Sequence, residues 1–448
     1  MRLNLFAATK RQCVSLLIPS CNAGGQQLCP ARRSFSSTAP ARADFTHIVI
    51  GAGVIGLATA RALALARPES STLLLERHAQ PGTETSSRNS EVIHGGLYYG
   101  AGTLKTRLCV AGKEALYAFC ARHGVGHART GKWIVAQDDD AERAALDALH
   151  AFCRDEVGVP TRLVGSEEAR RREPDVRAAA VLESPTTGIV DSHGLMVALR
   201  GHFEEAGGTT ALRARVVGVE ALRGSSGVPG SAGWSVSVRS GDGDDNNGGA
   251  TTTTGETSRV TAETIINSAG LGAADVHNMI APAGRQAKLY YAKGNYFSYA
   301  ASRPRVSRLV YPVTPPGAGG LGTHLTLDLA GRARFGPDVE WVDSPDDLDV
   351  SGAAGGRLPR ALAEIRRYLP GVDGAALAPD YAGVRPKLAP AGAVGAGKGF
   401  VDFYVRREDG FEGWVSMLGM ESPGLTSCLA IGDYVVDLLY GSQSRSPG

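Results

Sequence analysis

The feature that most constrains this chain is a glycine triplet that directly follows an apolar run. Residues 47–50 predict a strand, and the alanine-rich pattern of residues 55–66 predicts a helix. A strand, a tight turn and a helix form the context in which Gly-x-Gly-x-x-Gly binds a pyrophosphate, because backbone amides and the helix N-terminus approach its oxygens. We therefore predict a dinucleotide site formed by Gly51, Gly53, Val54, Ile55 and Gly56.

A second strand and an acidic residue extend this pattern. Residues 71–75 predict the strand, and Glu76 follows twenty residues after Gly56. A carboxylate at this place accepts hydrogen bonds from a ribose diol. Glycine triplets alone are weak signals in a chain with 58 glycines, so the prediction depends on the whole succession. We assign Glu76 and its neighbour Arg77 to the nucleoside end of the site.

The first 43 residues have the composition of a mitochondrial transit peptide. They contain six basic residues, no Asp or Glu, and many Ser and Ala. Without them the chain has 41 basic residues (47 less these six) against 45 acidic ones, a net charge of −4. This balance implies neither nucleic acid nor an anionic membrane as a partner. We expect a mitochondrial protein whose 448-residue precursor forms two domains or one large composite.

The cysteines outside this segment are Cys109, Cys120, Cys153 and Cys428, and none has Cys-x-x-Cys spacing. They indicate buried free thiols rather than a disulfide scaffold or a metal site. No apolar run reaches the roughly 18 residues typical of a spanning helix. We therefore expect no transmembrane segment, while peripheral contact with a membrane is compatible with the sequence.

A polar loop at residues 82–90 leads to a segment at 91–99 that contains His94 and two glycines. By itself this pattern fits a surface turn as well as a cofactor loop. Because it follows a dinucleotide fingerprint, we favour a loop that wraps the cofactor. Its predicted contacts are Ser86, Ser87 and Asn89, with His94 at the end of the loop.

The middle of the chain predicts a change from alternating strands and helices to antiparallel strands. Residues 211–220 and 233–239 predict two strands of an antiparallel meander. The Gly-, Asp-, Asn- and Thr-rich tract 240–258 predicts a disordered insertion. A strand at 260–267 ends near Ala269 and Gly270, which we assign to the adenosine side. Aromatic runs and alternation at 290–328 predict a separate antiparallel sheet. The predicted cofactor-domain parts are 44–130, 186–285 and 380–440, and the substrate-domain parts are 131–185 and 286–379.

The chain returns to the cofactor near its C-terminus. Residues 417–433 predict a strand end, a glycine turn and a helix, which offers a second helix N-terminus to an electron-rich group. A nicotinamide enzyme continues the alternating βα pattern instead, so this organisation favours FAD. The fold class is α/β, a Rossmann-like FAD-binding domain with an interleaved antiparallel substrate domain. The assigned flavin contacts are Gly419, Pro423, Gly424, Leu425 and Thr426.

Five segments resemble the L-2-hydroxyglutarate dehydrogenase branch of the D-amino-acid-oxidase-like flavoprotein family. They are residues 51–56, 85–99, 293–296, 384–387 and 421–426, and the similarity extends over nearly all of the chain after the presequence. The resemblance implies FAD, oxidation of L-2-hydroxyglutarate to 2-oxoglutarate, and an electron acceptor other than NAD. A quinone and an electron-transfer protein are both candidates for that acceptor.

Such a reaction needs cations for the carboxylates and a base for the hydroxyl proton. Arg385 is the first candidate for the C1 carboxylate because a guanidinium binds it with two hydrogen bonds, with Lys387 or Lys293 assisting. A surface salt bridge is the alternative for Arg385. His94 and His324 compete as the base. A structural role is the alternative for His94, and a solvent-facing position is the alternative for His324.

Two other functions are compatible with the residues. One is an amine- or amino-acid-oxidising enzyme of the same fold that reduces molecular oxygen. The other is a non-catalytic FAD-binding protein, for example an accessory factor of tRNA modification. The first predicts peroxide production from neutral amino acids, and the second predicts a flavin that no small acid reduces.

Overall fold

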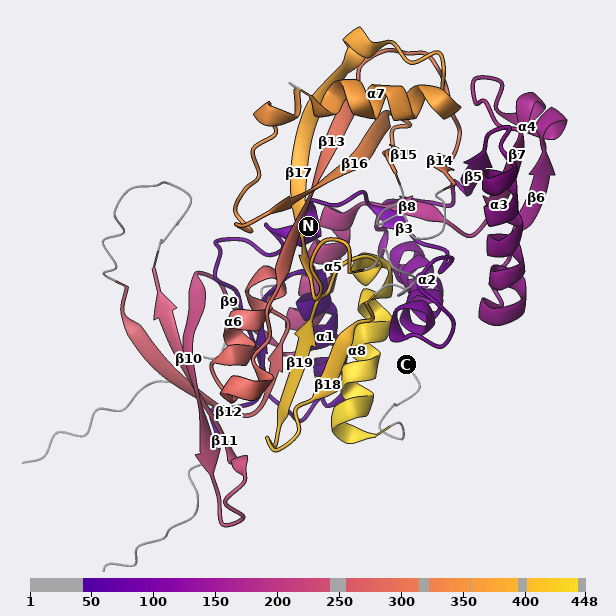
Figure 1. Ribbon diagram of the computed structural model, residues 1–448. Helices are drawn as coiled ribbons and strands as arrows, with labels where there is room; N and C mark the ends of the chain where they lie inside the picture. The colour runs from indigo at the N-terminus through magenta and orange to yellow at the C-terminus, as the bar shows by residue number, and fades with distance from the viewer. Residues whose placement is uncertain (1–42, 242–254, 314–321, 355, 394–400, 442–448) are drawn as a thin grey trace, which may run out of the picture. The chain divides into compact units, whose positions relative to one another are not determined.

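The computed structural model describes residues 43–241, 255–313, 322–354, 356–393 and 401–441 (Figure 1). The predicted presequence, residues 1–43, lies outside these ranges except for its last residue. Residues 242–254 of the predicted insertion also lie outside them. The described residues on either side of that segment form strands up to Ser240 and from Thr257 onwards, so regular structure continues further than the sequence indicates.

The first sheet is a parallel sheet of the Rossmann type. Its parallel strands are β9 (Thr209–Ala211), β2 (Thr72–Leu75), β1 (Phe45–Ile50), β12 (Thr257–Asn267) and β19 (Trp414–Leu418), in that order. The strand β18 (Tyr404–Arg407) adds an antiparallel edge. The hairpin of β10 (Ala214–Arg223) and β11 (Pro229–Ser240) pairs with the first half of β12, which confirms the predicted meander (Figure 1).

Four helices pack beside this sheet in one buried apolar cluster. They are α1 (Val54–Ala66), α2 (Leu104–His123), α5 (Ser192–Glu205) and α8 (Gly424–Tyr440). The helix α8 contacts both α1 and α2 closely. A Cβ on Gly432 would lie 2.7 Å from Ala58 O, and one on Gly112 would lie 2.6 Å from Thr426 O. These glycines therefore allow the contacts that place the start of α8 beside the start of α1.

The second sheet is antiparallel except for one pair, β14–β5. Its strands in spatial order are β17 (Leu377–Lys387), β13 (Tyr290–Tyr299), β16 (Ala333–Val342), β15 (His324–Leu327), β14 (Leu309–Pro312), β5 (Lys132–Ala136), β7 (Ala180–Ser184) and β6 (Arg162–Gly165). The helix α7 (Arg357–Tyr368) contacts β16, and α3 (Asp140–Phe152) contacts β5 and β7 (Figure 1). The short strands β3 (Val92–Ile93), β8 (Gly188–Val190) and β4 (His127–Ala128) form a third sheet.

Two short α-helices, α4 (Ser166–Arg172) and α6 (Ala273–Asn278), complete the α-helices of the described ranges.

The α/β architecture with an interleaved antiparallel sheet confirms the predicted fold class. The predicted boundary at residue 380 is wrong, because it falls inside β17, which pairs with β13 along its length. The second sheet therefore keeps this strand, and the chain returns to the first sheet only after it.

Two further expectations concern the cysteines and the membrane. Cys109, Cys120, Cys153 and Cys428 are all buried free thiols, as predicted. In the ranges that the structure describes, no helix has the length and apolar character that a membrane crossing requires.

Candidate active site

The turn between β1 and α1 can be built only with glycine. Gly51 has a φ of +98°, in the left-handed region, and a Cβ there would lie 2.7 Å from Ser268 O. A Cβ on Gly56 would lie 1.8 Å from Gly51 O. The first turn of α1 therefore sits directly on the end of β1, and Gly53 at the N-cap has no side chain that could bond to this turn. Ser86 Oγ accepts a hydrogen bond from Val54 N at 3.0 Å. Gly53, Val54 and Ile55 line a cavity, so the helix N-terminus lies at an open space, the arrangement that binds pyrophosphate.

A cavity of about 380 Å³ lies at the end of β2, and Glu76 and Arg77 line it. The Glu76 carboxylate accepts hydrogen bonds from Ala52 N at 2.8 Å and from His78 N at 2.9 Å. Each of its oxygens keeps a second lone pair, so ribose hydroxyls can still donate to it. Arg77 forms an ion pair with Glu84 across the same cavity. Ala269 and Gly270 also line this cavity.

A larger cavity of about 780 Å³ adjoins the first one. The residues that line both cavities are Gly53, Thr85, Ser86, Ser268 and Gly270. The combined space therefore passes from Glu76, across the N-terminus of α1, to the second sheet. Its elongated course and glycine-lined middle fit a dinucleotide whose pyrophosphate lies at α1.

Most of the predicted cofactor residues line one of these cavities. They are Gly51, Gly53, Val54, Ile55, Glu76, Arg77, Ser86, Asn89, Ala269, Gly270, Pro423, Gly424 and Leu425. The others line neither cavity and support the walls instead. Ser87 donates to Glu84 O, Thr426 Oγ1 accepts from His94 N at 3.0 Å, and Gly419 forms a turn with a φ of +66°. Gly56 is needed for the close approach described above.

The N-terminus of α8 faces the larger cavity beside that of α1. A Cβ on Gly424 would lie 3.2 Å from Ile55 Cδ1, so the two helix starts are in contact. Pro423 at the N-cap provides no side-chain hydrogen bond to the first turn. The positive ends of two helix dipoles therefore meet at one cavity, where they favour negative charge on a bound group.

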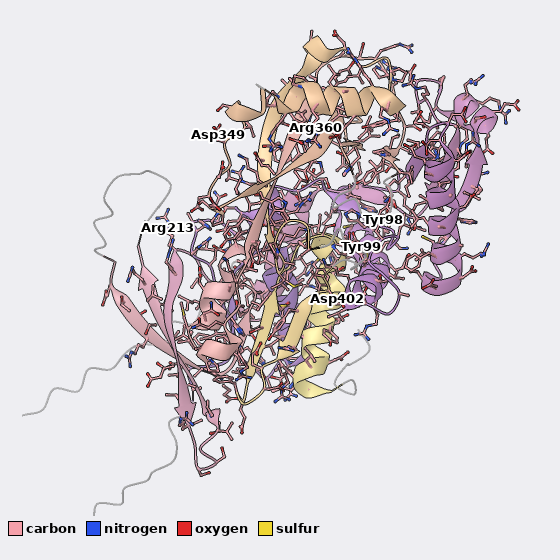
Figure 2. The ribbon with its side chains drawn as sticks, in the orientation of Figure 1. Tyr98, Tyr99, Arg213, Asp349, Arg360 and Asp402 are labelled. Atoms are coloured by element: carbon pink, nitrogen blue, oxygen red, sulfur yellow. The ribbon has the colours of Figure 1, made fainter. Side chains whose placement is uncertain are left out.

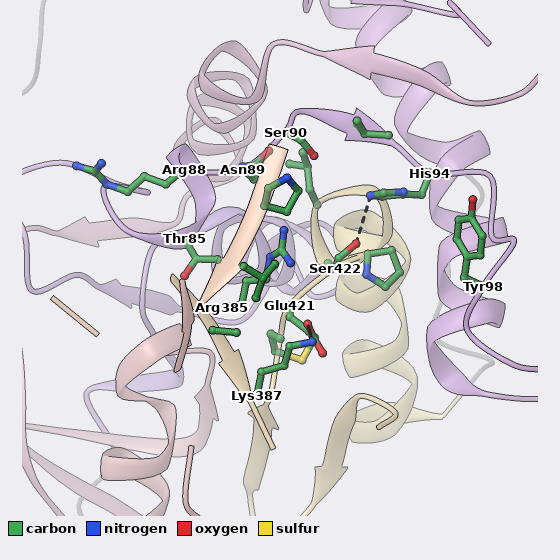
Figure 3. Close-up of a pocket in the computed structure, with 18 of the residues that line it drawn as sticks. Thr85, Arg88, Asn89, Ser90, His94, Tyr98, Arg385, Lys387, Glu421 and Ser422 are labelled. Carbon is green, nitrogen blue, oxygen red and sulfur yellow. Dashed lines mark hydrogen bonds and ion pairs between the residues drawn. The ribbon is translucent and has the colours of Figure 1, made fainter. Parts of the chain in front are cut away.

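His94 lies in the wall of this cavity, after β3. Its Nε2 is 3.2 Å from Ser422 Oγ, and no hydrogen-bond partner among the described residues reaches its buried Nδ1 (Figure 3). Burial lowers the pKa of His94 to about 3, and the positive charges of Lys132, His324 and Arg385 contribute in the same direction. The imidazole is therefore neutral near neutral pH.

His324 also lines the cavity, so a solvent-facing position is excluded. It is 5% exposed and stacks on Tyr311 with ring centroids 3.7 Å apart, while its Nδ1 lies 2.9 Å from Gly322 O. The alternation of residues 322–328 suggested one solvated face. The strand β15 instead lies inside the second sheet, between β14 and β16, and all four of its residues are buried.

Arg385 and Lys387 project from alternate positions of β17 into the same cavity (Figure 3). Residues two apart on a strand share a face and lie about 6.6–6.8 Å apart along it. The side chain of Arg385 belongs to the cavity wall, not to a surface salt bridge. Burial alone would lower its pKa, but the neighbouring Tyr296 and Glu421 outweigh this effect and keep its pKa raised. The guanidinium is therefore a fixed positive charge.

Lys387 Nζ forms an ion pair with Glu421 Oε2 at 2.5 Å. The other oxygen of that carboxylate, Oε1, is 3.1 Å from Nζ of Lys105, a residue in the first turn of α2. Burial would raise the pKa of Glu421, but Lys105 and Lys387 together hold it below its ordinary value. Glu421 is thus an ionised group shared by two lysines.

Lys293 is not brought to this cavity, which corrects its assignment as an assisting cation. Its Nζ lies 2.8 Å from Asp347 Oδ1 and 2.6 Å from the carbonyl oxygen of Asp349. In the register of β13 with β17, Ala292 pairs with Arg385 and Lys293 with Val384, so Lys293 lies on the opposite face of the sheet. Figure 2 shows Asp349 well separated from Tyr98 and Tyr99, which line the cavity.

Several site residues carry no obvious sequence signal. Lys105 is 1% exposed. From the sequence, a lysine two residues after the helix N-cap Thr103 would be expected to lie on the solvent-exposed face of the helix. Its only sequence signal is a position on the same helical stripe as buried Leu108 and Cys109. Lys132 is also buried, and its ammonium lies 4.7 Å and 4.6 Å from the ring centroids of Tyr98 and Tyr311. Burial lowers its pKa to about 7.

The fold and the site define a class: an α/β protein with a dinucleotide-binding cavity between a Rossmann-like sheet and an antiparallel sheet. The family model described as DAO, FAD-dependent oxidoreductase, matches residues 47–438. The chain belongs to this family, and FAD is its cofactor. The match extends from the first strand to the last helix, so it includes every part of the site.

Within this family, the chain is similar to curated proteins named L-2-hydroxyglutarate dehydrogenase. The mitochondrial L-2-hydroxyglutarate dehydrogenase of Arabidopsis thaliana is 36% identical over 413 residues, which covers 87% of this chain and 82% of the relative. The L-2-hydroxyglutarate dehydrogenase of Escherichia coli (strain K12) is 27% identical over 443 residues, with 90% and 96% covered. Relatives from plants and mammals are named mitochondrial, and the bacterial one is not.

Solved structures share the fold. The L-alpha-glycerophosphate oxidase of Mycoplasma pneumoniae, with FAD bound, has a TM-score of 0.72 and 21% identity, covering 88% of this chain and 94% of its own. The glycine oxidase of Geobacillus kaustophilus has a TM-score of 0.68 and 19% identity, with 90% and 96% covered. At these identities the likeness establishes the architecture alone.

Proposed function

We propose that this protein oxidises L-2-hydroxyglutarate to 2-oxoglutarate with bound FAD. The names of the relatives that match most of the chain support this substrate. The observation that carries the proposal is the pair of cations, Arg385 and Lys387, on one face of β17 in the cavity that also contains His94. A five-carbon 2-hydroxy diacid has two carboxylates and one hydroxyl for these groups to bind.

The residues along the combined cavity would hold FAD. The β1–α1 turn would bind the pyrophosphate, Glu76 the ribose, and the N-terminus of α8 the electron-rich edge of the flavin. Bound FAD supplies the acceptor, at flavin N5, for a hydride from C2 of the substrate. The protein residues then have to orient the substrate and remove its hydroxyl proton.

Arg385 would bind the C1 carboxylate with two parallel hydrogen bonds. His94 would take the hydroxyl proton at Nε2, because this nitrogen lies beside Ser422 in the cavity wall while Nδ1 is enclosed. The substrate brings two negative charges, which raise the pKa of a nearby imidazole. His94 would therefore become a stronger base when the diacid binds. His324, stacked on Tyr311, is the second candidate for the same proton.

A substrate panel tests the proposal against its alternatives. The FAD-loaded protein is assayed with L-2-hydroxyglutarate and an artificial electron acceptor, and with neutral amino acids while peroxide is measured. We expect turnover of the diacid and formation of 2-oxoglutarate. Peroxide from neutral amino acids, without turnover of the diacid, would favour an amine oxidase. A flavin that no compound reduces would favour an accessory protein.

We infer that the protein acts in the mitochondrion, with residues 1–43 as its transit peptide. The acid-free, arginine-containing composition of this segment supports the inference. So do the names of the plant and mammalian relatives. Fractionation of the source cells and sequencing of the mature N-terminus test it. A cytosolic protein that retains residues 1–43 would contradict it.

A further inference from the structure

The larger cavity contains a charge arrangement that the proposed reaction does not require. Glu421, a carboxylate, lies in the wall next to the two cations that would bind a diacid. Its side chain is 10% exposed, and its low pKa keeps it ionised. An ionised carboxylate at this place would repel the second carboxylate of the substrate. Its charge must therefore be balanced from another direction.

Lys105 provides that balance from behind the cavity wall. Its ammonium is 3.1 Å from Glu421 Oε1, and its side chain is 1% exposed, while Lys387 approaches Oε2 from the cavity side. The two lysines therefore hold opposite oxygens of one carboxylate. Lys105 itself lines neither cavity.

The position of Lys105 is fixed by the start of α2. Asp402 Oδ2 accepts a hydrogen bond from Leu104 N at 2.7 Å, and Asp402 Oδ1 accepts one from Lys105 N at 2.8 Å (Figure 2). Because the Asp402 carboxylate binds these backbone amides, it does not pair with the Lys105 ammonium, which pairs with Glu421 instead. The ammonium also lies 5.3 Å from the ring centroid of Phe403.

We propose that Lys105 is a positioning residue that sets the substrate charge this cavity selects. Together Arg385, Lys387 and Lys105 have three positive charges and Glu421 has one negative charge, a net of two. With Lys105 present, the negative charge of Glu421 is shared between two ammonium groups, so Lys387 stays paired with Glu421 and still attracts the distal carboxylate of a dianionic 2-hydroxy acid. Without Lys105, Glu421 neutralises Lys387, and one positive charge is left for the C1 carboxylate. This inference rests on the proposed function in one respect, namely that the dianionic substrate is L-2-hydroxyglutarate.

The test measures binding to the FAD-loaded protein, not only turnover. Glutarate and its monoamide have the same length but differ by one charge, and both are titrated while the flavin spectrum is followed. We expect the wild-type protein to bind glutarate more tightly. In Lys105→Met we expect the Kd of glutarate to rise about tenfold, because Lys387, then neutralised by Glu421, loses its charge-assisted contact with the second carboxylate. The Kd of the monoamide, which lacks this carboxylate, should change less than about twofold.

A second variant separates charge from structural damage. Lys105→Met combined with Glu421→Gln restores the net charge of two, so we expect the Kd of glutarate to return to within about twofold of wild type. Lys113→Met is the matched control, because Lys113 is another buried lysine of α2 that pairs with Glu114 at 3.3 Å and lines neither cavity. It should leave both Kd values unchanged.

Three results would overturn the inference: no preference for glutarate in the wild type, equal weakening of both ligands in Lys105→Met, or no recovery in the double variant. If these binding results hold while L-2-hydroxyglutarate is not oxidised, the proposed function fails and the inference about Lys105 stands. In steady-state assays of an active enzyme, Lys105→Met should raise KM for the diacid with little change in kcat.

Discussion

His94 Nε2 lies 3.2 Å from Ser422 Oγ, although 328 positions separate the two residues along the chain. A second hydrogen bond connects the same segments, since His94 N donates to Thr426 Oγ1 at 3.0 Å. The end of the loop at residues 82–94 is therefore connected by two hydrogen bonds to the start of α8. This places a neutral imidazole in the cavity that the two helix N-termini and the cations of β17 also line.

Replacement of His94 tests its role as proton acceptor. We expect His94→Ala to lower kcat by about 10²–10⁴-fold, the range for loss of a general base, while FAD stays bound. Activity and the FAD content of the purified variant are measured together. Wild-type turnover in a variant with full FAD content would show that His94 is structural, and His324→Ala would then be the next variant to examine.

The close approach at Gly56 predicts a loss of cofactor. In Gly56→Ala the new Cβ would lie 1.8 Å from Gly51 O, a contact that only a shift of the turn can relieve. We expect this variant to lack FAD, as measured by flavin absorbance per protein. Gly201→Ala in α5 is the control, because no atom lies within 4 Å of its added Cβ.

The control variant should keep FAD. Its melting temperature should stay the same or rise, since Ala is favoured over Gly in a helix by about 0.5–1 kcal/mol. Full FAD content in Gly56→Ala would contradict the structure of the turn.

Lys293 is predicted to matter for stability and not for catalysis. Its ammonium contacts Asp347 and the carbonyl of Asp349 on the face of the second sheet opposite the cavity. Lys293→Met should therefore lower the melting temperature and leave KM for the diacid within about twofold of wild type, because no charge in the cavity changes. Arg385→Lys should raise KM instead, because lysine cannot form the bidentate pair of hydrogen bonds with the C1 carboxylate. An equal rise of KM in both variants would contradict this division.

The acid stability of the second sheet should depend on Glu183. Burial would raise the pKa of Glu183, but hydrogen bonds from Arg172, Trp133 and Arg162 lower it to about 2. Because the folded-state pKa lies below the unfolded one, the ionised form stabilises the fold above about pH 4.5, and this contribution is lost as the pH falls towards 2.

Melting temperatures of wild type and Glu183→Gln between pH 7 and pH 3 test this dependence. We expect the variant to be less stable at pH 7 and the difference to shrink as the pH falls. A difference that does not change with pH would contradict an electrostatic role for Glu183.

The sequence predicts well those parts of the fold that depend on neighbouring residues. The strand, glycine turn and helix at residues 47–66 depend on apolar spacing and on the absence of side chains, which are both visible in one short segment. The antiparallel meander and the separate aromatic sheet follow from alternation in the same way. The glycine turn before α8 is also a local pattern, and its residues Pro423 to Leu425 lie at the cavity.

The remaining features depend on which strands become neighbours, and a single sequence does not contain this information. Lys293 and Arg385 are both cations on strands, but the pairing of β13 with β17 puts them on opposite faces. His324 is buried because its ring stacks on Tyr311, which comes from the neighbouring strand β14. Lys105 meets Glu421 across 316 positions of the chain, so no spacing rule could connect them.

An anaerobic titration with L-2-hydroxyglutarate measures the central claim most directly. The FAD-loaded protein is mixed with the diacid in the absence of any acceptor, and the flavin absorbance at about 450 nm is followed, a property of the cofactor itself. The account predicts complete bleaching by one equivalent of the L enantiomer, with one equivalent of 2-oxoglutarate formed. A flavin that stays oxidised in excess diacid would contradict it.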